Sequence, residues 1–465
     1  MMVLALEAFS VGILVVMLVY TLRHLLFAVN RLYCAHRINY TDLAGFHLPS
    51  VSVLIPMHNE EAVAPDVLEA LLESDYPHDP GVFEIIPIDD HSTDGTGEIL
   101  DQYAARHSCI RVLHRRSGER GKGAALAAAT RISKGEIIIL FDADYVPGKS
   151  LLKFLAAPFA DPEVGAVMGR VVPHNVGSNL LTRLTDLERA GGYQISQQAR
   201  YNLGLIAQYG GTAGGVRRAA LEEAGKAYGD VDGGWRASSL TEDTDLTLRL
   251  AIQGWKIAYV NRAECYEEAP ATWEARRKQI ERWAIGHTDC LHRYLGPLLR
   301  SPHLSARAKL DGVLLLGVYL TAPLIVFGWL ASVGLFFSGR SFLPTLTTFV
   351  LASACYNALG NFASFFEIGS SVILDGAHQK IRLLPLNIVN FIFSTATVSV
   401  ALAKYYGGRI LGRHFPWNKT LRFRNGGGNG NGNGNGNGHG PNGFGNERGL
   451  NFIRAKSAAS VSALP

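Results

Sequence analysis

The sequence predicts an α/β domain with a mostly parallel, Rossmann-like sheet, flanked by transmembrane α-helices. Three observations predict this class. Between about residues 48 and 270, short apolar runs alternate with helical periodicity, as in strand–helix units. These runs are continuously apolar, which is typical of parallel strands covered on both faces. Longer apolar stretches stand on both sides of this region, and each reaches the roughly 20 residues that a bilayer span needs.

Residues 1–30 are expected to form an uncleaved membrane anchor. The basic residues Arg23, His24, Arg31 and Arg37 follow the apolar run. A signal peptide would carry its positive charge before that run. Because basic residues favour the cytoplasmic side, we expect a multi-pass protein of the plasma (inner) membrane whose central domain lies in the cytoplasm.

Within residues 310–410, three further spans are expected: Gly312–Gly339, Ser341–Phe366 and Leu383–Ala403. Four spans with an outside start would place the C-terminus outside, yet residues 404–424 are basic and favour the inside. Either an interfacial or re-entrant piece exists near Glu367–Leu374, or the charge rule fails here. Residues 425–465 are rich in Gly and Asn and are expected to form a disordered tail.

Composition excludes several classes of function. The net charge of +4 is too small to favour a nucleic acid partner, and the basic residues gather beside the apolar stretches, as at a membrane surface. The five cysteines are scattered and form no C-x-x-C pair, which argues against a zinc site or a disulfide framework and favours a reducing compartment.

Polar residues follow three of the expected strands. In open parallel sheets, ligands bind beyond the carboxyl ends of the strands, so these residues are expected at one edge. Two aspartates two residues apart on an extended chain would point the same way and hold one hard cation, Mg²⁺ or Mn²⁺, together with a diphosphate. An Asp pair that caps a turn would look the same. The residues are His58, Asn59 and Glu60 after the first strand, Asp89 and Asp90 after the second, and Asp142 and Asp144 after the fourth.

Two further segments carry candidate groups. Lys122 stands in "GERGKGAAL", which lacks the phosphate-loop spacing of an NTPase; a lysine at a helix start still suits a phosphate, and a solvated turn lysine is the alternative. Glu242 and Asp243 precede an expected helix. A carboxylate there can deprotonate an attacking hydroxyl, or it can simply cap the helix.

Residues 271–300 are expected to form an amphipathic interfacial helix. Gln279, Arg282 and Trp283 fall within about one turn of it. The indole ring could form a platform for a sugar, and membrane-surface anchoring is the alternative.

Taken in order, "PMHNEE", "DDHSTDGT", "GKGAAL", "DAD", "GTAGG", "TEDTDL" and "QIERW" resemble the family-2 glycosyltransferases of the processive, membrane-embedded kind, such as cellulose, chitin, hyaluronan and mannan synthases. The resemblance implies a GT-A-type fold and an inverting hexosyltransferase. Its substrates would be a nucleotide-sugar donor such as UDP-glucose and the end of a growing β-linked polysaccharide. Export through the membrane helices would follow, with room for accessory export proteins as partners.

The resemblance also implies roles for single residues. His58, Asn59, Glu60, Asp89 and Asp90 would hold the nucleoside, and Lys122 and Asp142 the diphosphate. Asp144 would hold Mg²⁺ or Mn²⁺, and Asp243 would be the general base. Gly211, Thr212, Glu242, Gln279, Arg282 and Trp283 would bracket the glycan acceptor and the diphosphate. His91 stands where many members have glycine, so the nucleoside pocket is expected to differ in detail.

Three alternatives stay open. The first is a non-processive transferase that adds one sugar to a lipid, and the second is a GDP-mannose-dependent mannan synthase. The third is an inactive scaffold that binds nucleotide sugars, which the presence of all the expected acids disfavours.

Overall fold

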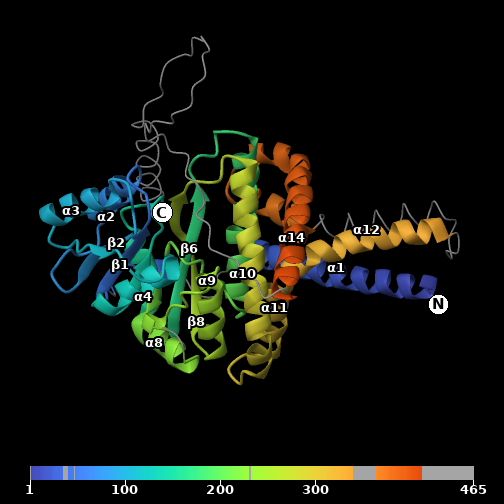
Figure 1. Cartoon of the computed structure of the whole chain (residues 1–465), viewed down its shortest axis with the longest axis horizontal. Coiled ribbons are helices and arrows are strands. Elements are labelled where there is room, and N and C mark those ends of the chain that lie inside the picture. The colour runs from blue at the N-terminus through green and yellow to red at the C-terminus, as the bar shows by residue number, and fades with distance from the viewer. Residues whose placement is uncertain (1, 35–39, 47, 230–231, 339–362, 411–465) are drawn as a thin grey trace, which may run out of the picture.

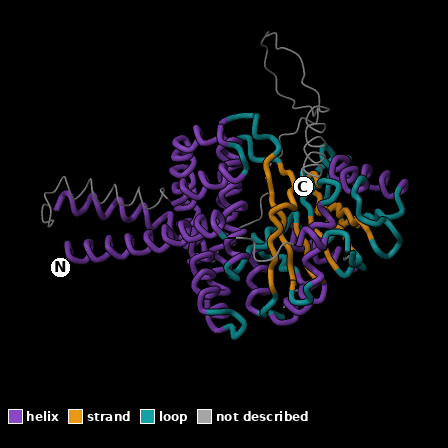
Figure 2. The backbone as a smooth tube through the Cα atoms, turned by 180° about the vertical axis from the view of Figure 1, so that it is seen from behind, coloured by secondary structure: helices purple, strands orange, loops and turns teal. Residues whose placement is uncertain are grey.

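The computed structural model describes residues 2–34, 40–46, 48–229, 232–338 and 363–410. An α/β domain with a central sheet lies on one side of the molecule, and a helical part lies on the other (Figure 1). Two long helices project from the helical part, with the N-terminus at the far end of one of them (Figures 1 and 2).

The sheet has eight strands in the order β3-β2-β1-β4-β7-β6-β8-β5. Strands β1 to β4 are mutually parallel, β7 runs antiparallel between β4 and β6, and β6 and β8 are parallel again. The predicted mostly parallel GT-A-like α/β class is therefore confirmed. The strands are β1 Val51–Met57, β2 Phe83–Asp90, β3 Leu113–Arg115, β4 Ile137–Leu140, β5 Val146–Pro147, β6 Val164–Pro173, β7 Gly214–Arg217 and β8 Lys256–Glu267.

The register of the parallel strands aligns their carboxyl ends. Met57 pairs with Asp89, and Leu54 pairs with Leu140. The side chains of β1 and β4 are almost wholly buried, because helices cover both faces of the sheet. The residues that follow β1, β2 and β4 consequently lie at one edge.

Helices fill the connections between the strands. The segment "GKGAALAAATRI" forms α4, as its composition predicts. Helix α3 begins at Thr96 after Gly95, and Asp94 accepts hydrogen bonds from the amide (3.1 Å) and hydroxyl of Thr96 in a local turn. The helices are α2 Ala64–Leu72, α3 Thr96–Arg106, α4 Lys122–Ile132, α5 Leu151–Ala156, α6 Leu180–Ala190, α7 Gln198–Asn202, α8 Arg218–Ala227 and α9 Glu242–Ile252, with a π-helical turn at Gly191–Gln197.

The helical part consists of α1 (Met2–Tyr33), α10 (Trp273–Arg300), α11 (Ala306–Gly317), α12 (Thr321–Ser338), the helix Ala363–Leu374 and α14 (Asn387–Ile410). Three described segments are long and apolar enough to cross a membrane: Val3–Tyr33, Ala306–Ser338 and His378–Ile410. Most of the predicted span Ser341–Phe366 and the whole predicted tail, 425–465, lie outside the described residues.

Polar contacts fasten the chain after the undescribed stretch 339–362 to the α/β domain. Asp375 accepts from Arg170 of β6 (2.5 Å) and from Gln194 (2.7 Å). Lys380 pairs with Asp186 of α6 at 2.6 Å. The chain just after Glu367–Leu374, where the sequence allowed an interfacial or re-entrant segment, therefore contacts the α/β domain.

Candidate active site

The loops at the carboxyl edge of the sheet carry unusual backbone conformations. Asn59 (φ 54°), His91 (φ 60°) and Ala213 (φ 46°) are the non-glycine residues with positive φ in the part of the chain that the structure describes. Asn59 follows β1, His91 follows β2, and Ala213 precedes β7. Such conformations cost free energy and persist where the surrounding structure holds them, often at functional sites.

Hydrogen bonds tie the loop after β1 to the loop after β2. His58 donates from Nδ1 to the carbonyl oxygen of Asp90 (2.7 Å). The Asn59 side-chain oxygen accepts from the amide of Thr93 (2.7 Å), and the amide of Glu60 donates to the hydroxyl of Thr96 (2.9 Å). The first two predicted clusters are thus brought together.

Asp89 points away from the edge. Its fully buried carboxylate accepts from the amide of Ser92 (3.1 Å) and from His114 Nδ1 (3.0 Å), and it pairs with Arg116 (2.8 Å). Burial alone would raise the pKa of Asp89, but these hydrogen bonds and the Arg116 charge hold it below its usual value. The structure therefore places Asp89 between β2 and β3, not in the open part of the site.

Asp90 faces the loop that leads into α4. One carboxylate oxygen accepts from Arg115 (2.5 Å) and His91 (2.8 Å), and the other accepts from the amide of Gly121 (3.0 Å). The last contact holds the start of α4, and with it Lys122, at the edge of the sheet.

Lys122 is the centre of the site. Its ammonium lies 2.8 Å from Asp142 Oδ1 and 3.1 Å from Glu242 Oε1, and it donates to the carbonyl oxygen of Gly211 (3.0 Å). Burial alone would lower the pKa of Lys122, but the charges of Asp142 and Glu242 raise it above its usual value, so the ammonium stays charged. Three residues that are far apart in the sequence, Asp142, Gly211 and Glu242, thus contact the ammonium of Lys122.

The two acids at the start of α9 differ in access. Glu242 is 6% exposed and pairs with Lys122, whereas Asp243 is partly exposed and accepts from the amide of Thr244 (2.7 Å). Burial raises the pKa of both carboxyls, and the charge of Lys122 opposes the rise.

Gly211 leaves little room beside this pair. Its φ is +68°, and a Cβ there would lie 2.9 Å from the Cβ of Asp243. The neighbouring Thr212 accepts from the amide of Asp142 (3.1 Å), so the segment Gly211–Thr212 packs against the acids from two elements.

Asp142 and Asp144 do not lie on an extended chain as expected. Strand β4 ends at Leu140, and the amide of Tyr145 donates to the carbonyl oxygen of Asp142 (3.1 Å) in a tight turn. The Asp142 side chain is 28% exposed beside Lys122, whereas Asp144 is 2% exposed. No group of three or more His, Cys, Asp or Glu side chains in the described ranges is arranged to hold a metal ion. An ion bound at this turn would therefore take most of its ligands from phosphate oxygens and water, as Mg²⁺ held by one or two carboxylates usually does.

The predicted acceptor residues on α10 have different surroundings. Arg282 is near enough to Glu242 and Asp243 for its charge to oppose the rise in their pKa values. Gln279 accepts from Arg276 (2.7 Å). The guanidiniums of Arg189 and Arg276 lie over the ring of Trp283, at 5.2 and 5.6 Å from its centroid.

Sequence reasoning missed a second polar cluster beside the acids. Tyr145 donates to Glu267 (2.8 Å), and Arg189 pairs with the same carboxylate (2.8 Å). Tyr193, in the π-helical turn, is influenced by charges of both clusters, namely Arg189, Glu267, Asp243 and Asp142, and burial raises its pKa to about 12. This cluster joins the acids to Trp283. Only the position of Tyr145 directly after Asp144 could have indicated it from the sequence.

His287 was also missed. Its Nε2 lies 3.1 Å from the hydroxyl of Thr244, the residue that follows Asp243. Burial, with the charge of Arg200, lowers the pKa of His287 to about 4, so the ring is neutral near pH 7. A neutral ring supports the first turn of α9 without adding charge to the site.

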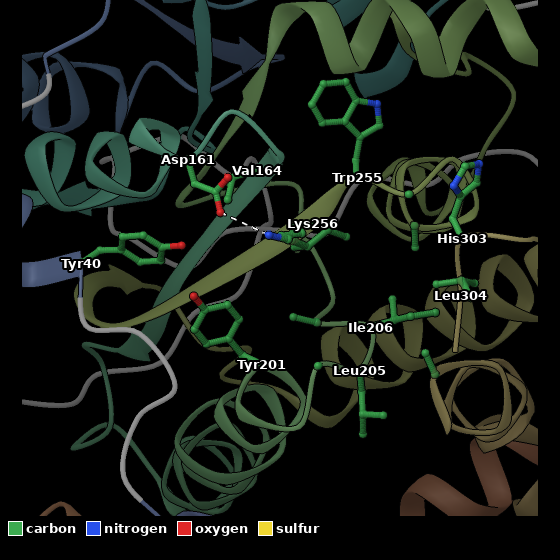
Figure 3. Close-up of a pocket in the computed structure, with 16 residues that line it drawn as sticks. Tyr40, Asp161, Val164, Tyr201, Leu205, Ile206, Trp255, Lys256, His303 and Leu304 are labelled. Atoms are coloured by element: carbon green, nitrogen blue, oxygen red, sulfur yellow. Dashed lines mark hydrogen bonds and ion pairs between the residues drawn. The ribbon is translucent and has the colours of Figure 1, made fainter. Parts of the chain in front are cut away.

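A separate cavity of about 230 Å³ opens near the starts of β6 and β8, at the end of the sheet opposite Asp142 (Figure 3). Aromatic side chains line it, including Tyr40, Tyr201 and Trp255, and Lys256 pairs across it with Asp161 at 3.4 Å. No residue of the predicted site lines this cavity.

Comparison with known proteins gives this arrangement a family context. The family model described as "Glycosyltransferase like family 2" matches residues 49–286. A probable glycosyltransferase of Bacillus subtilis, YdaM, is 28% identical over 387 residues, covering 81% of this chain and 87% of the relative. A β-monoglucosyldiacylglycerol synthase of Synechocystis is 35% identical over 246 residues, 53% of this chain and 49% of the relative. A glucomannan 4-β-mannosyltransferase of Arabidopsis thaliana is 28% identical over 272 residues, 56% of this chain and 47% of the relative.

The chain therefore spans about half the length of the last two relatives. Among solved structures, the mannosyltransferase PcManGT of Pyrobaculum calidifontis, in complex with GDP-Man and Mn²⁺, superimposes with a TM-score of 0.54 at 21% identity. The superposition covers 82% of this chain and 98% of that one, and it supports the fold.

Proposed function

Because the chain belongs to the family-2-like glycosyltransferases, we propose that it transfers a hexosyl unit from a nucleotide-diphosphate sugar to the end of a growing β-linked polysaccharide at the membrane. The observation that carries the proposal is the convergence of Asp142, Glu242 and Asp243 with Lys122 at one edge of the sheet. Acidic and cationic groups at such an edge suit a diphosphate and an attacking hydroxyl together.

In the proposed reaction, Asp243 takes the proton of the acceptor hydroxyl. The hydroxyl oxygen attacks the anomeric carbon as the bond from that carbon to the diphosphate breaks, which inverts the configuration. Asp243 suits the task because it is the more exposed of the two acids, and its raised pKa makes it a stronger base than an ordinary aspartate. General base catalysis typically contributes about 10²–10⁴-fold.

The leaving nucleotide diphosphate gains negative charge, and two cations face it in the proposal. Lys122 already lies among the acids, and the charge of Arg282 acts on them. Fixed charges in a site of restricted solvent access stabilise such a transition state. A Mg²⁺ or Mn²⁺ ion held by Asp142 and Asp144 would neutralise diphosphate charge in the same way.

A path for the acceptor is proposed along the second polar cluster. The partly exposed rings of Tyr193 and of Trp283 on α10 would offer aromatic contacts, and Glu267 and Arg189 would offer polar contacts. Sugars bind to such mixed surfaces through ring stacking and hydrogen bonds. The nucleoside would lie near His58, Asn59, Glu60 and Asp90, where the β1 and β2 loops are joined.

A lipid acceptor is the second candidate. The observation in its favour is the 35% identity, over 246 residues, to a synthase of β-monoglucosyldiacylglycerol. In that case the reaction would stop after one sugar, and the product would stay in the lipid phase.

The test uses membranes that contain the full chain, incubated separately with radiolabelled UDP-glucose, UDP-N-acetylglucosamine and GDP-mannose in the presence of Mg²⁺ or Mn²⁺. We expect one donor to label a polymer that stays at the top of a gel and is not extracted by chloroform–methanol. Membranes without the protein are the control. Label found only in an extractable one- or two-sugar lipid would refute polymer synthesis and favour the second candidate.

A further inference from the structure

Helix α14 lies lengthwise along α10, although its length and composition would let it cross a bilayer. The paired helices α1 and α12 project away from the body, whereas α14 runs across them beside α10 (Figures 1 and 2). Side-chain contacts follow both helices in the same direction. They join Trp273 to Phe393 (ring centroids 4.7 Å), Glu281 to Lys404 (2.9 Å), Asp289 to Tyr405 (3.3 Å) and His292 to Tyr406 (3.1 Å).

The extent of this contact distinguishes two arrangements. From Phe393 to Tyr406 a helix rises about 20 Å. A helix that crosses the membrane would touch a helix lying on the surface at one crossing point only, over about two turns or roughly 11 Å. The observed contact requires that α14 share the depth of α10.

Helix α10 carries too many charges to lie in the hydrocarbon. The side chains of Glu274, Lys278 and Arg293 are 58%, 43% and 39% exposed. Each such charge would cost about 2.5–3.5 kcal/mol at the centre of a bilayer. These charges exclude α10 from the hydrocarbon but allow it to lie at the membrane surface. Because α14 lies alongside α10, the same depth applies to α14.

The face of α14 away from α10 is apolar and exposed in the part of the chain that the structure describes. Ile388, Val389, Ile392 and Val400 are 40–55% exposed and recur at helical spacing. On a helix that lies flat, such a face enters the lipid by about 5–10 Å. The neighbouring pair α1 and α12 also exposes large apolar side chains, and both helices belong to segments that are long and apolar enough to cross a bilayer.

We propose that α14 is a surface helix whose face formed by Ile388, Val389, Ile392 and Val400 binds the lipid of the bilayer that α1 and α12 enter. The chain before it already lies on the side of the α/β domain, as the contacts of Asp375 and Lys380 show. Because α14 does not cross, the basic residues near its end, Lys404 and Arg409, stay on that side too, which satisfies the positive-inside rule. This revises the predicted span Leu383–Ala403 and does not depend on the proposed function.

Depth measurements test the proposal directly. The full chain is reconstituted in vesicles of phosphatidylethanolamine and phosphatidylglycerol after Cys34, Cys109 and Cys355 are replaced by serine, whereas Cys265 and Cys290 are kept because they are buried and not accessible to a label. One further cysteine is then introduced at a time to carry a spin label. We expect Val389→Cys and Val400→Cys to report the same shallow depth, although they are 11 residues apart. As a control, Phe327→Cys and Phe337→Cys on α12 should differ in depth by about 15 Å.

The opposite result is equally clear. If Val389→Cys and Val400→Cys differ in depth by about 16 Å, as along a spanning helix, the proposal is wrong. A protease-sensitive tag after Pro465 gives a second measurement in sealed inverted vesicles, where the α/β domain faces outward. The proposal expects rapid cleavage of the tag, and a protected tag would contradict it. Retained nucleotide-sugar binding shows that each variant is folded.

Discussion

Lys122 has a larger part in the site than its motif predicts. The sequence placed it at a helix start near phosphate, but could not show that Asp142, Gly211 and Glu242 surround it, because these contacts depend on the packing of α4, β4 and α9. The positions of Tyr193 and His287 near the acids were not predictable for the same reason. They depend on how the π-helical turn and α10 pack against the rest of the domain.

The first prediction concerns the charge of Lys122. Removing it in Lys122→Met should raise the pKa of Asp243, since that charge now opposes the effect of burial. A base works only when it is ionised, so activity falls as the pH drops through its pKa. The acid limb of the pH profile of kcat/KM should therefore move to higher pH in this variant, besides an overall loss of activity.

Lys226→Met is the matched control, because Lys226 is an exposed residue of α8 away from the acids. It should leave the acid limb where it is in the unmodified protein. An acid limb that stays in place, or moves to lower pH, in Lys122→Met would exclude Asp243 as the group whose ionisation Lys122 supports.

The strand ends illustrate how far an element can be predicted. Continuous apolar runs predicted the parallel strands, and the polar residues after β1, β2 and β4 do lie at one edge. The direction of each side chain was less predictable. Asp89 turns toward β3, and the turn at Asp142–Tyr145 replaces the expected extended chain. Side-chain direction at a strand end depends on which neighbouring donor is available, and a periodic pattern does not contain that information.

The second prediction follows from the position of Asp89 between β2 and β3. Asp89→Asn should lower stability by about 1–3 kcal/mol, because a buried carboxylate that pairs with charged groups is lost. The pKa of Asp89 is lower in the folded protein than in the unfolded chain. The contribution of Asp89 to the free energy of unfolding is therefore fully present above the pKa of the unfolded chain, and it disappears as the pH falls through the pKa of the folded protein. The thermal midpoint of the full chain in detergent, measured at pH 7, checks the loss.

Asp101→Asn is a close control. Asp101 accepts from the other nitrogen of His114 (2.9 Å) but is 64% exposed, and exposed pairs contribute about 0–1 kcal/mol. Equal midpoints for the two variants would show that Asp89 does not stabilise the β2–β3 edge.

For the molecule as a whole, the composition predicted a mostly parallel α/β domain between long apolar segments, and the fold class is confirmed. The proposed surface orientation of α14 was not predictable, because hydropathy measures length and apolarity but not direction. If α14 lies on the surface, as proposed, α1 and α12 are the described helices that would cross. Export of a polymer would then require further crossing segments, which makes the product assay more decisive.

The central claim is that acids from separate elements form one site around an activated sugar, with Asp243 as the base. The most direct test is Asp243→Asn, whose side-chain oxygen can still accept from the amide of Thr244. Binding of the donor, measured by calorimetry, should stay within about threefold, while the rate of transfer falls by about 10²–10⁴. Asp289→Asn, on the exposed side of α10, should behave like the unmodified chain. Transfer by Asp243→Asn at close to the normal rate would contradict the account.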